Sequence, residues 1–149
     1  MVERGTSNYN ATYDVWFTSS GSALPSSASG PGTGGAFLMV WLFKPGADSA
    51  TGAKARQPRG SIVENGRAVG NVSGAWNIWY DNSNPPCVSY VSKTPISALQ
   101  FDLNDFIKDA IANNYGVTNS QYLSLVFAGF EVWGGGNGLK INQFCANVK

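Results

Sequence analysis

Apolar and polar positions alternate with a period of two along most of the chain, which is the pattern of half-buried β-strands. Over residues 8–17 the odd positions are apolar or aromatic, and Asn10, Thr12 and Asp14 alternate with them. This alternation predicts a strand with one face in the core. Trp16 falls on the polar face of that strand, beside Asp14.

A second strand is predicted over residues 36–43, where the sequence AFLMVWLF is apolar at every position. A run that is apolar on both faces is typical of a central strand that is covered from each side. Its branched residues suit the core, and its other face carries Phe37, Met39, Trp41 and Phe43. Loops are predicted on either side, over residues 18–35 and 46–60, which are rich in Gly, Ser and Pro. The second loop carries cations that we expect to be solvated: Lys54, Arg56 and Arg59.

The rest of the chain predicts short strands and one helix. The strands are expected over residues 61–64, 67–69, 75–81, 87–92, 122–133 and 139–148. Asn65-Gly66 predicts a turn between the first two of these strands. From Leu99 to Ile111 the apolar positions follow the helical period, with Asp102 and Asp105 near the start. One all-β sandwich domain over residues 1–149 is the expected architecture.

The composition excludes several classes of chemistry. The chain has no histidine, so it cannot hold a Ser-His-Asp or Cys-His catalytic centre or an HExxH zinc site. The glycine run 134–138 lacks the following Lys-Ser/Thr of a phosphate-binding loop and predicts a hairpin loop instead. We therefore predict no cofactor and no metal, and the remaining acid/base groups are carboxylates.

Charge and hydropathy narrow the choice of partners. Ten Lys and Arg residues against nine Asp and Glu leave a net charge of +1, too little to favour nucleic acid. No apolar run is long enough for a membrane span, and the first residues lack the pattern of a signal peptide. Glycosylation sequons begin at Asn10 and Asn71. The composition is similar to that of secreted fungal polysaccharide-handling domains, so a secreted and a fungal cytosolic location both stay open.

Seven short blocks, in order and spacing, resemble glycoside hydrolase family 12, whose members are endoglucanases and xyloglucanases. The blocks are YDVWFT (13–18), FLMVWL (37–42), GAWNIWY (74–80), CVSYVS (87–92), FDLNDFI (101–107), SQYL (120–123) and AGFEVWGG (128–135). The resemblance implies a jelly-roll of two curved antiparallel sheets, with one helix on the convex side and a concave cleft for a glucan chain. The long N-terminal stretch of strands in that family has no counterpart here.

The resemblance also assigns three positions of the family's chemistry. Glu131 matches the acid/base carboxyl, and Asp14 matches the aspartate that assists the nucleophile. The nucleophilic Glu itself is replaced by Phe37, and no Asp or Glu lies between Thr18 and Lys44. Because phenylalanine cannot attack the anomeric carbon, the expected function is carbohydrate binding without catalysis, as in a lectin.

Aromatic and carboxylate residues are expected to form the sugar-binding face. The candidates are Asp14, Trp16, Phe37, Met39, Trp41, Glu131 and Trp133. Flat aromatic rings match the apolar face of a pyranose, whereas neighbouring polar groups satisfy its hydroxyls. The same residues could equally be ordinary core or surface positions. Two other functions stay open: hydrolysis by Glu131 with Asp14, and a decoy that binds proteins which recognise glucanases.

Two further expectations concern covalent and quaternary structure. Cys87 and Cys145 are the only cysteines, and a bridge between them would close a loop of roughly 60 residues; the alternative is two free thiols. Bare sheet edges and a low charge content predict a homodimer, with the strand over residues 8–17 as the candidate edge. Alternatively, the two long loops cover the edges and the chain stays monomeric.

Overall fold

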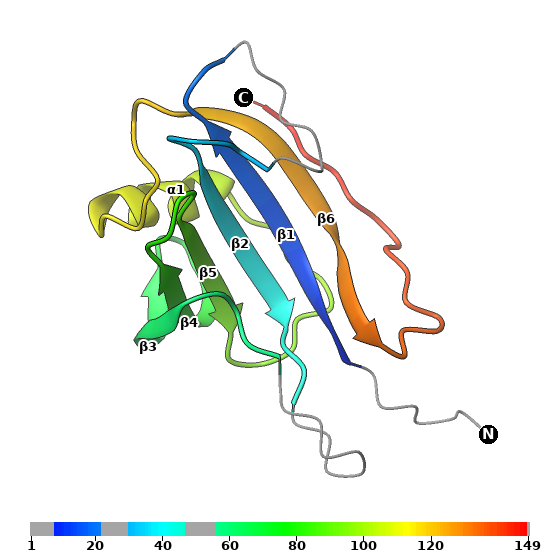
Figure 1. Cartoon of the computed structure of the whole chain (residues 1–149). Coiled ribbons are helices and arrows are strands. Elements are labelled where there is room, and N and C mark those ends of the chain that lie inside the picture. Colours follow the sequence, from blue (N-terminus) through cyan, green and yellow to red (C-terminus); the bar gives the residue numbers. More distant parts are fainter. Residues whose placement is uncertain (1–7, 22–29, 47–55, 149) are drawn as a thin grey trace, which may run out of the picture.

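The computed structural model describes residues 8–21, 30–46 and 56–148. They form one curved sheet of six strands, in the order β3-β4-β5-β2-β1-β6, with a single helix, α1, against one face (Figure 1). The strands are β1 (Asn8–Thr18), β2 (Ala36–Phe43), β3 (Ser61–Val69), β4 (Val72–Asp81), β5 (Cys87–Ser92) and β6 (Tyr122–Gly134). Neighbouring strands are antiparallel except β2 and β5, which are parallel. The predicted all-β class with one helix is confirmed.

The turn in the β3–β4 hairpin lies later than predicted. β3 is continuous over Ser61–Val69, and its pairing with β4 shifts register around Asn65-Gly66 without ending the strand. The chain reverses at Gly70 and Asn71 instead, where Gly70 has a φ of +48° that favours glycine.

Helix α1 covers Leu103–Ala112, so it starts later than the apolar period predicts. Asp102 is its N-cap, and the carboxylate of Asp102 accepts a hydrogen bond from the Asn104 N–H at 2.9 Å. Leu99 precedes the helix and packs against the core from a non-helical segment, which explains why it fits the apolar pattern. Asn113 caps the C-terminus, and Asn114 follows with a φ of +58°.

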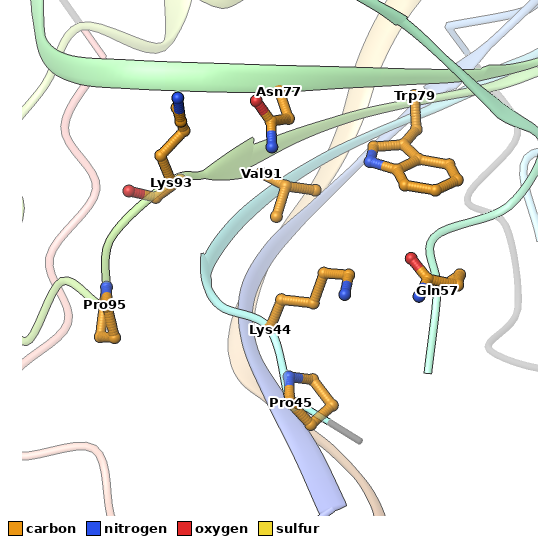
Figure 2. Close-up of a pocket in the computed structure, with 10 residues that line it drawn as sticks. Lys44, Pro45, Gln57, Asn77, Trp79, Val91, Lys93 and Pro95 are labelled. Carbon is orange, nitrogen blue, oxygen red and sulfur yellow. The ribbon is translucent and has the colours of Figure 1, made fainter. Parts of the chain in front are cut away.

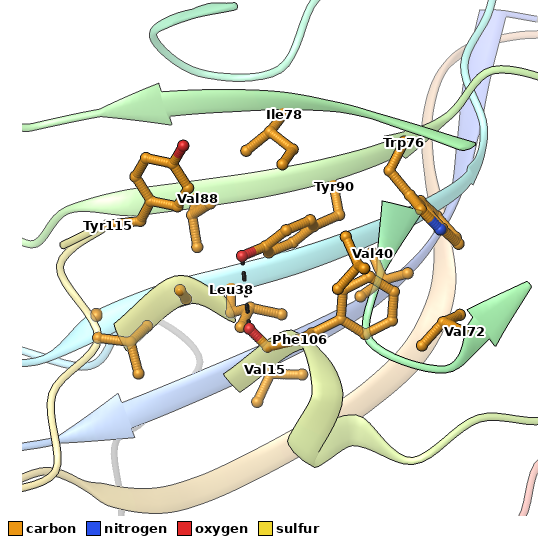
Figure 3. Packing of buried hydrophobic residues seen from close by; sticks show 14 of the residues in the cluster. Val15, Leu38, Val40, Val72, Trp76, Ile78, Val88, Tyr90, Phe106 and Tyr115 are labelled. Atoms are coloured by element: carbon orange, nitrogen blue, oxygen red, sulfur yellow. Dashed lines mark hydrogen bonds between the residues drawn. The ribbon is translucent and has the colours of Figure 1, made fainter. Parts of the chain in front are cut away.

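The main core lies between the sheet and α1, on what we call the helix face of the sheet. Phe106 of α1 packs against Trp76 and Tyr90, with ring centroids 5.2 and 4.9 Å apart (Figure 3). Around these rings lie branched residues of the central strands, among them Val15, Leu38, Val40, Ile78 and Val88. The alternation in β1 and β2 therefore predicted the core side of both strands correctly.

A charged group joins the helix to the sheet at the edge of this core. The guanidinium of Arg67 on β3 donates to both carboxylate oxygens of Asp109 on α1, at 2.5 and 2.9 Å. The buried hydroxyl of Tyr90 on β5 donates to the same carboxylate at 2.8 Å. Burial and the Asp109 charge raise the pKa of Tyr90, and the hydrogen bond with Asp109 raises the pKa of Arg67. Asp109 thus connects three elements.

The predicted closing strand over residues 139–148 is wrong. These residues form no strand and run beside β6 toward the C-terminus (Figure 1). Phe144 packs its ring 6.0 Å from that of Tyr13 on the helix face, which orients the segment across the sheet surface and not along a hydrogen-bonding edge. Consequently the described residues contain one sheet, where the prediction had two.

The expected disulfide is also wrong, because Cys87 and Cys145 are both free. Cys87 is buried on β5, whereas Cys145 is exposed in the segment after β6. Two strands, β2 and β1, separate β5 from β6, and the segment that carries Cys145 runs beside β6, so the two cysteines lie apart (Figure 1).

The strand expected at an edge is internal. β1 pairs with both β2 and β6, and the edges of the described sheet are β3 and β6. Homodimer formation stays a prediction, but β1 is not available for strand pairing. No helix among the described residues is long and apolar enough to cross a membrane.

Candidate functional site

The face of the sheet opposite α1 collects the predicted site residues, and we call it the aromatic face. Register places Asp14 of β1 between Met39 of β2 and Phe127 of β6, and Trp16 opposite Phe37. The rings of Trp41 and Trp133 lie 6.3 Å apart. All seven candidates lie on this face: Asp14, Trp16, Phe37, Met39, Trp41, Glu131 and Trp133.

Phe43 does not share this face, contrary to the simple alternation. The β1–β2 register shifts so that Thr12 lies opposite Trp41 and Ala11 lies opposite Phe43. The extra residue, Leu42, is a bulge that turns Phe43 to the other face. There the ring of Phe43 packs 4.9 Å from that of Tyr9.

The aromatic face contains both buried and solvent-accessible rings. Trp16 and Trp41 are only 8% and 2% exposed, whereas Trp133 is 37% exposed and Phe127 is 43% exposed. Trp16 lies edge-on between Phe37 and Phe127, each with ring centroids 5.5 Å away. Trp133 and Phe127 are therefore the rings that a flat ligand can reach, and the buried tryptophans support them.

Phe127 was not identified from the sequence, although a signal for it was present. Alternation counted back from Glu131 along β6 passes through Gly129 and reaches Phe127 on the same face. Trp79 of β4 was not predicted as a site residue either. It packs against an aromatic-face cluster that contains Met39, Trp41, Cys87 and Val91.

Asn10 fixes the position of Glu131. The side chain of Asn10 is completely buried and lies opposite Glu131 in the β1–β6 pairing. Its carbonyl oxygen accepts from the Glu131 N–H at 2.9 Å, and its amide donates to the Glu131 carboxylate. This contact uses both polar ends of the amide, so the sequon at Asn10 is inaccessible to glycosylation in the folded chain. Asn71, in the β3–β4 turn, is exposed.

Asp14 carries a partly buried carboxyl in the middle of the aromatic face. Burial raises its pKa to about 6; the nearby indole N–H of Trp16 lowers the pKa in part, and the charge of Glu131 raises it further. Neither Asp14 Oδ1 nor Trp16 Nε1 makes a hydrogen bond of normal length within the described residues. The Trp16 N–H therefore offsets only part of the effect of burial on the pKa of Asp14. The Asp14 carboxyl is neutral over part of the acidic range.

The raised pKa predicts that Asp14 destabilises the fold as pH rises. Between about pH 4 and 6 the folded protein keeps a proton that the unfolded chain has released, so stability falls through this window. Asp14→Asn lacks the titrating group. We expect its stability advantage over the unmodified chain to grow by about 2 kcal/mol between pH 3.5 and 7.5. Urea unfolding at the two pH values measures this difference, and an unchanged difference would contradict the assignment.

The ring of Phe37 lies at the position that the family resemblance assigns to the nucleophile. It contacts Trp16 on one side, and the Arg59 guanidinium lies 5.5 Å from its centroid. Arg59 is held by Asp81 at 2.8 Å and by the Ser83 hydroxyl at 2.7 Å. Phe37 pairs with Trp16, which is two residues from Asp14 on β1, whereas Glu131 pairs with Asn10 farther along β1. Phe37 therefore lies closer to Asp14 than to Glu131 in the sheet.

Arg56 and Arg59 are exposed, as expected of a solvated run, and each also contacts a ring of the aromatic face. Arg59 stacks on Phe37, and the Arg56 guanidinium lies 5.6 Å from the ring centroid of Trp133. Lys54 lies outside the described residues. Alternation gave no signal for these contacts, because they come from a loop.

An open pocket of about 340 Å³ lies beside the aromatic face (Figure 2). Trp79 and Asn77 of β4 and Val91 of β5 line it, together with Lys44 and Lys93, which follow β2 and β5. In the part of the chain that the structure describes, no three His, Cys, Asp or Glu side chains gather as metal ligands. The aromatic face therefore offers aromatic surface and two central carboxyls, and the pocket beside it offers amide and ammonium groups.

Comparison with known proteins identifies relatives over the whole chain. The family description "Glycosyl hydrolase family 12" matches residues 2–149. The chain is 31% identical over 145 residues to the probable cellulase Cel12b of Mycobacterium tuberculosis, covering 95% of this chain and 85% of that protein. It is 27% identical to Endoglucanase S of Pectobacterium parmentieri, covering 98% of this chain and 51% of the relative. Both relatives are bacterial, so a fungal source gains no support from them.

The fold is similar to solved structures of the same family. Endoglucanase Cel12A of Rhodothermus marinus superposes with a TM-score of 0.67 at 34% identity, covering 87% of this chain and 51% of that one. The expected β-jelly-roll class is thus confirmed. The chain spans about half the length of Endoglucanase S and of this solved structure.

Proposed function

Because this chain belongs to glycosyl hydrolase family 12, we propose that it binds β-glucan on its aromatic face without hydrolysing it. The observation that carries this proposal is the side chain at position 37. The family resemblance places the nucleophilic carboxylate there, and the structure has a phenylalanine packed against Trp16.

The chemistry of retaining glycosidases explains why this exchange matters. One carboxylate must bond to the anomeric carbon while a second carboxyl, about 5 to 5.5 Å away, protonates the leaving oxygen. Phe37 can form no such bond, and Arg59 lies over its ring. The acid/base candidate Glu131 remains in place, hydrogen-bonded by Asn10, but it lacks its partner.

The same face keeps features that suit a sugar chain. The exposed rings of Trp133 and Phe127 offer flat apolar surface to pyranose rings. Glu131 is exposed two residues before Trp133 on the same face of β6, and its carboxylate can accept hydrogen bonds from sugar hydroxyls. Aromatic surface with nearby polar groups is the usual composition of a ligand site.

This function predicts that the protein releases no reducing sugar from barley β-glucan or xyloglucan between about pH 4 and 8, where carboxylate pairs operate. A reducing-sugar assay over a long incubation measures it, with Glu131→Gln as the matched variant. Equal background signals from both proteins are expected. Turnover that disappears in Glu131→Gln would refute the noncatalytic proposal.

One observation favours a second candidate function, hydrolysis by Asp14 with Glu131. The pKa of Asp14 is raised to about 6 with Glu131 contributing, and a raised pKa is a property of catalytic acids. In that case Asp14→Asn abolishes activity in the same assay. The position of Asp14 between Met39 and Phe127, with its Oδ1 buried, supports binding over catalysis.

A further inference from the structure

Two positively charged side chains line the pocket beside the aromatic face. The side chains of Lys44 and Lys93 line it from the ends of β2 and β5 (Figure 2). Within the described ranges neither lysine forms an ion pair, since the ion pairs there join Arg59 to Asp81 and Arg67 to Asp109. No Asp or Glu is among the residues that line the pocket.

The neutral groups of the pocket add hydrogen-bond donors. Asn77 accepts a hydrogen bond from the Gly66 N–H at 2.9 Å through its side-chain oxygen, which leaves its NH₂ group to donate. Figure 2 shows this amide and the Trp79 indole directed toward the pocket, with Gln57 on the opposite wall. A cavity with two ammonium groups and amide and indole donors is complementary to an anion.

The pocket is continuous with the aromatic face. Its wall residues Trp79 and Val91 pack in one cluster with Met39 and Trp41 of that face. A chain that lies on the aromatic face can therefore place a substituent in the pocket.

Two carboxylates on this side of the sheet, those of Asp81 and Glu131, already interact with other residues of the chain. Asp81 is paired with Arg59, and Glu131 is hydrogen-bonded by Asn10. Arg56 adds a further cation above Trp133. Glu131 keeps its charge on the aromatic face, because Asn10 is neutral, whereas the residues that line the pocket include two lysines and no carboxylate.

We propose that the pocket binds the carboxylate of a uronic acid residue, so that the preferred ligand is an acidic β-linked polysaccharide. This inference rests on the proposed binding function of the aromatic face. The Lys44 and Lys93 ammonium groups lie on opposite sides of the pocket in Figure 2, so each would attract a carboxylate of the polysaccharide separately, while a sugar ring lies against Trp79.

Calorimetric titration with two matched probes tests this inference. The probes are cellohexaose and a β-1,4-linked hexamer of the same length whose C6 positions are oxidised to carboxylates. We expect the oxidised hexamer to bind about ten-fold more tightly at low ionic strength. The preference should shrink near 0.5 M salt, where the Debye length is only a few ångströms. Lys44→Met and Lys93→Met should each remove most of the preference and leave the affinity for cellohexaose unchanged.

Lys108→Met is the matched control, because Lys108 is exposed on α1, on the other side of the sheet. It should keep the full preference. Equal affinity for the two probes, or an equal loss in the Lys108 variant, would overturn the inference while the proposed binding function stands. Absence of binding by both probes would overturn both.

Discussion

Replacing Trp133 with alanine is expected to weaken binding of cellohexaose about thirty-fold, since an exposed aromatic platform acts as a binding hot spot. Trp133 is 37% exposed, packs on the buried Trp41 and lies two residues after Glu131 on β6. Its removal takes away the ring and leaves the sheet hydrogen bonds of β6 intact. Fluorescence or calorimetric titration measures the dissociation constant, and Trp133→Phe should retain part of the affinity.

Val132→Ala is the matched control for this prediction. Val132 neighbours Trp133 on β6, is 51% exposed and lies opposite Tyr9, on the helix face. We expect this variant to bind as the unmodified chain does. Equal losses in both variants would mean that β6 itself is perturbed, and no loss in Trp133→Ala would remove this ring from the site.

The Asp109→Ala substitution is expected to lower the free energy of unfolding by about 4 kcal/mol, because it leaves a partly buried charge and a buried hydroxyl without their acceptor. Asp109 accepts from Arg67 of β3 and from Tyr90 of β5, so its loss also weakens the attachment of α1 to the sheet. Urea unfolding followed by tryptophan fluorescence measures the change.

Lys108→Ala provides the comparison within the same helix. Lys108 is exposed, so its substitution should change the free energy of unfolding by less than about 0.5 kcal/mol. If Asp109→Ala also costs less than about 1 kcal/mol, the Arg67–Asp109–Tyr90 group does not stabilise the fold in the way argued here.

Alternation predicted β1 and β2 well because both strands separate two differently packed faces. The branched residues Leu38 and Val40 pack toward α1, and Met39 and Trp41 pack on the aromatic face. The alternation of faces with a period of two continues, however, only where the pairing between the two strands has no bulge. The bulge at Leu42 reversed Phe43, and only the pairing with β1 reveals that bulge.

The pattern of apolar and polar positions could not predict contacts between segments that lie far apart in the sequence. Asn10 is a strand residue with the pattern of a glycosylation site, and its role emerges only where it meets Glu131, which is 121 positions away. The loop arginines over Phe37 and Trp133 had no periodic signal for the same reason.

Cys145 illustrates a further limit of the family resemblance. The resemblance gave the order of strands but not their pairing, and the disulfide depended on a closing strand over residues 139–148. Because that segment runs unpaired beside β6, its alternating apolar residues predicted a strand that did not form. Phe144 and Ile141 remain 44% and 47% exposed, and Phe144 contacts the ring of Tyr13, so apolar residues in this segment reflect partial burial without strand pairing.

Titration of cellohexaose into the protein in a calorimeter is the most direct test of binding without hydrolysis. The account predicts heat that returns to baseline after each injection and saturates near one oligosaccharide per chain, with the hexamer recovered intact. Continuing heat flow after each injection, together with shortened oligosaccharides, would contradict the account, as would the absence of any binding heat.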